Sequence, residues 1–182
     1  MNLSEVVPFL TDPEKSAQML KEGKVDAAVT YEPFISQYLN SNDFHVVYSS
    51  KDAPGIIMDI LTFRTDFIQT HPETIEAIIR AYFKGLNYSK EHSEEAHRIT
   101  AKQYNDTTES ISNQLKGIKT LDERDNQIAF TFAAGLRSIY GNMRQVGKFI
   151  LKHQGETQIH LETDNLIERK FIKKISEENS PS

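Results

Sequence analysis

The first third of the chain alternates short apolar runs with amphipathic helical patterns, and this alternation constrains the fold more than any other feature. Parallel strands that are buried on both faces need continuous small or β-branched apolar residues, and helices connect them. Runs of this kind cover residues 6–10, 25–31, 45–50 and 55–63. We therefore predict an α/β fold that begins with the remnant of a mostly parallel sheet.

The rest of the chain carries helical patterns. Between Pro72 and Ser89 apolar residues recur at steps of three and four, which puts them on one face of a helix. Gly135, Gly141 and Gly147 lie in a longer apolar pattern, and we expect the helix to break at these glycines. The other predicted helices cover residues 12–22, 93–104, 107–117, 128–150 and 163–175. The second part of the chain is thus predicted to be helix-rich.

Composition excludes several classes of function. The formal net charge is −5 and Lys and Arg are scattered among acids, so we expect no nucleic-acid partner. No apolar run approaches the roughly 20 residues of a membrane span, and residues 1–15 do not resemble a secretion signal. The absence of cysteine excludes disulfides, thiolate catalysis and cysteine-based zinc sites.

The sequence contains no recognisable catalytic or cofactor motif. It has no nucleophile elbow, no P-loop and no dinucleotide-binding glycine pattern. His92 and His97 flank Glu94 and Glu95, but the histidines are five residues apart and do not share a helix face as a metal-binding pair does. We read this cluster as a solvated helix, and we predict no enzyme activity, no cofactor and no metal.

The run at residues 25–31 ends abruptly in the sequence Tyr31-Glu32-Pro33. Proline fits the first turn of a helix, which places Glu32 at or beside the N-cap. Ligands of open α/β sheets bind where strands end and helices begin, so Thr30, Tyr31 and Glu32 are candidate ligand-binding residues. In the alternative interpretation, Glu32 only completes the helix start and Tyr31 packs beneath it.

Asp59 is a second candidate ligand-binding acid, within the apolar run at 55–63. Two acids favour a cationic or donor-rich ligand such as an amine or an aminopyrimidine, whereas the helix start after Pro33 favours an anion. Asp59 has an equally good structural interpretation, in which its carboxylate accepts internal hydrogen bonds and contacts no ligand.

The segment "LKEGKVDAAVTYEPFISQY" at 20–38 resembles solute-binding proteins of the nitrate, sulfonate, taurine and thiamine-pyrimidine-precursor group of ABC importers. In that group, a helix ending in glycine leads into a V-D-A strand and an aromatic-acid-proline turn. The stretch at 49–92 is similar to the group's strand through the interlobe hinge and the helix after it. Residues 163–175 are similar to the group's terminal helix.

The resemblance implies a fold of the periplasmic-binding-protein type II, built from two lobes. It implies that this chain corresponds to the C-terminal portion of such a protein, without the first-lobe strands or a signal peptide. Residues 1–62 would belong to the second lobe, residues 63–176 would return to the first, and residues 177–182 would form a disordered tail. The apolar faces that the missing part would cover are expected to promote self-association.

The resemblance further implies an extracytoplasmic receptor that closes around a small-molecule ligand and docks on a membrane permease, without making or breaking bonds. Two alternatives remain open. One is a ligand-sensing domain of a signalling protein. The other is a thiamine-pyrimidine synthesis enzyme of the same fold, although that branch uses cysteine-rich motifs and this chain has no cysteine.

Overall fold

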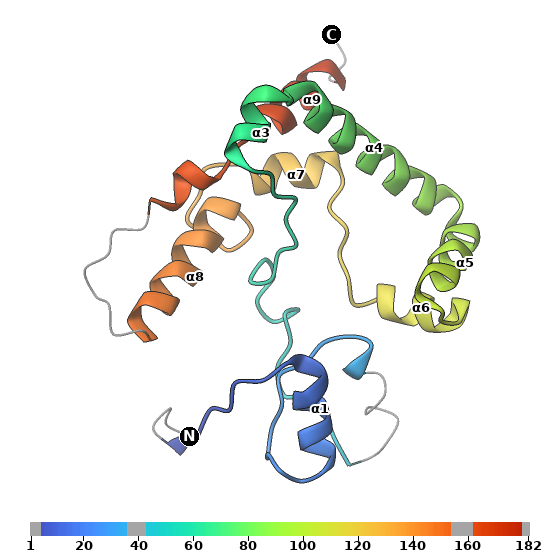
Figure 1. The fold of residues 1–182 in the computed structure, drawn as a ribbon, viewed down its shortest axis with the longest axis vertical. Coiled ribbons are helices and arrows are strands. Elements are labelled where there is room, and N and C mark those ends of the chain that lie inside the picture. The colour runs from blue at the N-terminus through green and yellow to red at the C-terminus, as the bar shows by residue number, and fades with distance from the viewer. Residues whose placement is uncertain (1–4, 36–42, 154–161, 180–182) are drawn as a thin grey trace. The chain divides into compact units, whose positions relative to one another are not determined.

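The computed structural model describes residues 5–35, 43–153 and 162–179. The regular elements in these ranges are helices (Figure 1). They divide between two compact units, one formed by residues 1–47 and 109–118 and the other by residues 48–108 and 119–182. We describe each unit by itself.

Unit 1 contains helix α1 (Pro13–Lys21) and most of α6 (Thr108–Leu115). As predicted, α1 begins with proline directly after Asp12, whose carbonyl oxygen accepts the Ser16 N–H at 2.8 Å. The Asp12 side chain makes no capping hydrogen bond. The chain reverses at Gly23, where a φ of +67° suits a residue without a Cβ.

The predicted sheet is not formed by the residues that the structure describes. None of them lies in a β-strand, and the runs at 6–10, 25–31, 45–50 and 55–63 are extended chain or turns. Their apolar side chains are largely exposed: Val7 at 94%, Leu10 at 97%, Val29 at 90%, Val47 at 87% and Ile57 at 75%. The difference between the predicted sheet and the observed extended chain has a physical reason. A strand exists only when a neighbouring backbone pairs with it, and an apolar pattern does not supply that neighbour.

Unit 2 holds the remaining helices, which build its core. They are α3 (Thr65–Thr70), α4 (Pro72–Glu91), α5 (Ser93–Tyr104), α7 (Glu123–Ala129), α8 (Ile139–His153), the 3-10 helix η2 (Thr163–Leu166) and α9 (Lys170–Asn179). Helix α9 lies against both α4 and α7 (Figure 1). Phe83 of α4 packs with Ile172 and Ile175 of α9, and Ile79 and Phe130 are partly buried against them.

The helices predicted over 72–89 and 93–104 are confirmed by α4 and α5. The apolar pattern at 128–150 is divided between α7 and α8 by a loop that contains Gly135, as expected. No break occurs at Gly141 or Gly147, which lie inside α8. Gly141 has a different role, because an added Cβ would overlap the backbone of Ala134 and Gly135. The glycine therefore lets α8 pass close to the loop.

The end of the chain also differs from its prediction. Residues 163–175 form η2 and the start of α9 rather than one helix, with Ile167 following the 3-10 turn. Residues 177–179, which the sequence placed in a disordered tail, form the last turn of α9, where Glu178 pairs with Arg80 of α4. Lys174 contacts both carboxylate oxygens of Glu76 at 2.8 Å, so two ion pairs join these helices.

Candidate functional site

The Tyr31-Glu32-Pro33 turn forms a defined local structure in unit 1. The Ile35 N–H donates to the Tyr31 carbonyl oxygen at 3.2 Å, which begins a helical turn after residue 31 as the sequence predicted. The Glu32–Pro33 peptide bond is cis. The rings of Tyr31 and Phe34 contact each other with centroids 5.8 Å apart, and Tyr31 is 59% exposed. The turn thus presents an aromatic side chain at a helix start.

Thr30 ties this turn to the beginning of α1. Its Oγ1 donates to the Pro13 carbonyl oxygen at 3.0 Å, and the side chain is half-buried. Glu32 is also half-buried and takes part in polar interactions. The three predicted residues Thr30, Tyr31 and Glu32 are therefore consecutive parts of one anchored turn, and the hydroxyl of Thr30 is used internally.

Asp59 lies in unit 2, whereas the turn lies in unit 1. Its side chain is exposed, in an extended stretch that runs from the end of a turn to Arg64. The structure does not bring Asp59 together with the turn within a single unit. Whether the two acids share a ligand stays a prediction from the sequence.

The stretch that carries Asp59 is anchored at its start. Asn142 of α8 donates through Nδ2 to the carbonyl oxygens of Gly55 and Ile56, at 2.5 and 3.2 Å. Gly55 has a φ of +93°, and a Cβ at this position would overlap the carbonyl group of Leu136. A glycine is therefore required here both by backbone conformation and by close approach.

The predicted solvated cluster near His92 forms the junction between α4 and α5. The Tyr88 hydroxyl donates to the Glu95 carboxylate at 2.8 Å, which raises the pKa of Tyr88, and the Tyr88 ring lies 4.4 Å from that of His92. Within the described ranges, no three His, Cys, Asp or Glu side chains gather as a metal site would require. No described helix is long and apolar enough to cross a membrane.

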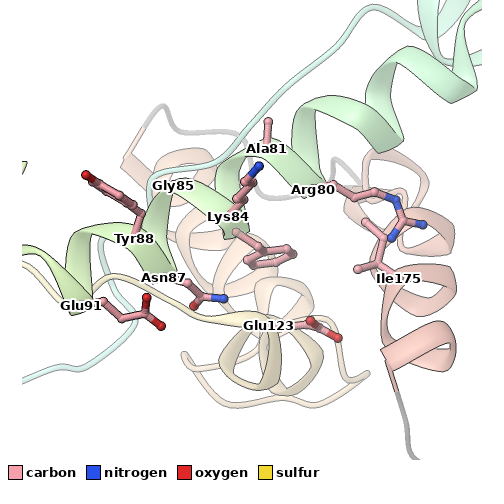
Figure 2. A pocket seen from close by; sticks show the side chains of 10 residues that line it. Arg80, Ala81, Lys84, Gly85, Asn87, Tyr88, Glu91, Glu123 and Ile175 are labelled. Atoms are coloured by element: carbon pink, nitrogen blue, oxygen red, sulfur yellow. The ribbon is translucent and has the colours of Figure 1, made fainter.

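Sequence reasoning missed a groove of about 790 Å³ along α4 in unit 2. Figure 2 shows the side chains that line it, with Glu91 at one end of the row and Arg80 and Ile175 at the other. The pattern of α4 indicated only an amphipathic helix. Gly85, in the middle of α4, was the sequence feature that could have drawn attention to this face, because glycine lowers the stability of a helix interior.

Comparison with known proteins shows where the chain belongs. Residues 4–105 match the NMT1-like family, and this range includes the Tyr31-Glu32-Pro33 turn and Asp59. The chain belongs to the NMT1-like family. The predicted relationship to solute-binding proteins of the nitrate, sulfonate and taurine group is thereby confirmed, and with it the expectation of a periplasmic-binding-protein-like fold at the level of the family.

One curated relative gives a more specific comparison. A Bacillus subtilis (strain 168) protein, whose name describes it as binding aliphatic sulfonates, is 22% identical over 119 residues. The match covers 65% of this chain and 36% of that protein, so the chain spans about a third of its relative's length. No solved structure matches the chain at a significant level.

Proposed function

We propose that this chain is part of the solute-binding component of an ABC importer for a small organic solute, with an aliphatic sulfonate as the leading ligand class. The match of residues 4–105 to the NMT1-like family carries the proposal, and the name of the Bacillus relative supplies the ligand class. Binding by hinge closure, docking on a membrane permease and an extracytoplasmic location are parts of the same proposal.

The Tyr31-Glu32-Pro33 turn is the proposed recognition edge. The exposed Tyr31 ring and the neighbouring Phe34 offer apolar contact to an alkyl chain. Backbone N–H groups at a helix start favour a sulfonate, whereas the carboxylates of Glu32 and Asp59 favour an amino group. An aminoalkanesulfonate such as taurine carries both of the groups that these preferences favour.

A second candidate ligand is an aminopyrimidine related to thiamine precursors. The two acids favour it, because carboxylates accept hydrogen bonds from amino groups and attract a protonated ring, and Tyr31 would stack on a planar ring. The sensory-domain and enzyme alternatives share the same turn. They differ from the importer in what the bound ligand would trigger.

A thermal-shift screen tests the proposal, using taurine, longer alkanesulfonates, nitrate and aminopyrimidines. A ligand present at 100 times its Kd stabilises the folded chain by about 2.7 kcal/mol, which raises the melting temperature measurably. We expect Tyr31→Ala and Glu32→Ala to reduce this rise, and Glu14→Ala on the exposed face of α1 to leave it unchanged. A chain that melts cooperatively but responds to none of these ligands would contradict the proposal.

A further inference from the structure

The groove along α4 has the size and floor of a small-molecule site. Its volume of about 790 Å³ lies within the range of roughly 300–1,000 Å³ that ligand pockets occupy. Phe83 and Ile175 line it and are 8% and 2% exposed, so the floor is apolar and is held by the core of unit 2. Helices α4, α7 and α9 all contribute lining residues (Figure 2).

Gly85 keeps part of this groove open. A Cβ placed on Gly85 would meet no atom within 4 Å, so packing within the described structure does not require glycine there. Glycine in the interior of a 20-residue helix lowers helix stability relative to alanine. The bare backbone leaves room for a bound molecule beside α4.

Two opposite charges on the groove have no partner in the part of the chain that the structure describes. Lys84 and Glu91 are seven residues apart on α4, which puts them on the same face two turns apart, with Cα atoms separated by about 10 Å. Both side chains are exposed. By contrast, Arg80 is paired with Glu178, and the Tyr88 hydroxyl donates to Glu95. Asn87 and Tyr88 lie between them along α4 (Figure 2), and Glu123, the other carboxylate on the groove, already takes part in an interaction. The groove therefore offers one available cation and one available carboxylate on the same face of α4.

We propose that this groove binds a small zwitterion, in which an anionic group and an ammonium group are joined by a short hydrocarbon linker. The anionic end pairs with Lys84, the ammonium end pairs with Glu91, and the linker lies along Asn87 and the Tyr88 ring between them. The flexible Lys84 and Glu91 side chains adjust to the length of the linker. This site belongs to unit 2, whereas the turn at Tyr31 belongs to unit 1, and it is additional to the proposed importer ligand site.

The test titrates the whole chain with 6-aminohexanoate, and separately with hexanoate and hexylammonium, followed by NMR chemical shifts. We expect saturable binding of the zwitterion, with shifts at Asn87 and Tyr88, and at least about tenfold weaker binding of either single-charge analogue. No saturable binding, or equal binding of hexanoate and 6-aminohexanoate, would overturn the proposal.

Matched variants test whether each of the two charges contributes to binding. Lys84→Gln and Glu91→Gln are each expected to weaken 6-aminohexanoate binding about tenfold, because each removes one charged partner. Lys102→Gln and Glu94→Gln make the same changes on the exposed surface of α5 and should have no effect. If the Lys84 and Glu91 variants bind 6-aminohexanoate as tightly as these controls, neither charge pairs with the ligand and the proposal is wrong.

A steric variant and a remote variant complete the design. Gly85→Leu fills the open space beside α4 and is expected to abolish binding while the helical circular dichroism signal is retained. Tyr31→Ala should leave 6-aminohexanoate binding unchanged, which separates this site from the proposed importer function. Wild-type affinity in Gly85→Leu would place the binding elsewhere and would refute the proposal.

Discussion

The helical core of unit 2, formed by α4, α7 and α9, contrasts with the extended segments at 6–10, 25–31, 45–50 and 55–63. Both are rich in apolar residues. In the helical core these residues are buried, as with Ile75 at 1% and Ile175 at 2% exposure, whereas Val29 and Val47 are 90% and 87% exposed. A helix completes its backbone hydrogen bonds within itself and needs only a packing partner. An apolar extended segment also needs a paired strand.

The largest expected effect is on stability in the helical core. Ile175→Ala removes a fully buried side chain between α4 and α9 and should lower the free energy of unfolding by about 2–5 kcal/mol. Ile57→Ala, the same change on a 75% exposed side chain in unit 2, should cost less than about 0.5 kcal/mol. Urea denaturation measures both. An equal cost for Ile57→Ala would show that the extended segment is buried in solution.

Two glycines within helices provide the next test. Gly141→Ala forces a Cβ against the backbone of Ala134 and Gly135 and should destabilise unit 2 by about 1–3 kcal/mol. Gly85→Ala introduces a Cβ into open space and should stabilise it by about 0.5–1 kcal/mol, through helix propensity. Thermal denaturation of the two variants should therefore give shifts of opposite sign. Shifts of the same sign would contradict the close approach of α8 to the loop.

The extended segments are expected to promote self-association, because they expose large apolar side chains and unpaired backbone. Light scattering at high concentration should give a mass above that of the 20.8 kDa monomer. Val29→Lys should lower this mass, whereas Gln18→Lys on the exposed face of α1 should not. A clean wild-type monomer at high concentration would count against the prediction.

The smallest expected effect is on the stability contributed by the N-cap residues of two helices, α7 and α1. Asp122 accepts the Asp125 N–H at 2.9 Å at the start of α7, and this hydrogen bond lowers the pKa of Asp122 below 3.8. The carboxylate therefore stabilises the fold at neutral pH, and this contribution is lost as pH falls from about 4 through the lowered pKa.

Asp122→Ala should reduce the melting temperature at pH 7, with the difference from wild type shrinking in acid. Asp12, at the start of α1, makes no side-chain capping bond, so Asp12→Ala should have a smaller effect at pH 7. Melting curves collected across the acid range distinguish the two positions. A larger loss from Asp12→Ala would reverse the expected order.

Sequence reasoning placed the candidate turn better than it placed the surrounding fold. The helix start after Tyr31 followed from Pro33, whose ring suits a first helical turn, and the structure has a helical turn there. The hydrogen bond from Thr30 to the Pro13 carbonyl oxygen spans 17 positions, and no local pattern indicates it. The position of Asp59 relative to this turn likewise depends on tertiary structure, and its role in ligand binding stays a prediction.

The sequence by itself determined the elements whose stabilising contacts are local. The spacing of apolar residues defined α4 and α5, and Pro13 and Gly23 marked the limits of α1. Tertiary structure alone decided the close passage at Gly141, the groove along α4 and the absence of strand pairing among the described residues. A helix forms its hydrogen bonds between residues four positions apart, whereas close approaches, grooves and sheets depend on residues that only folding brings together.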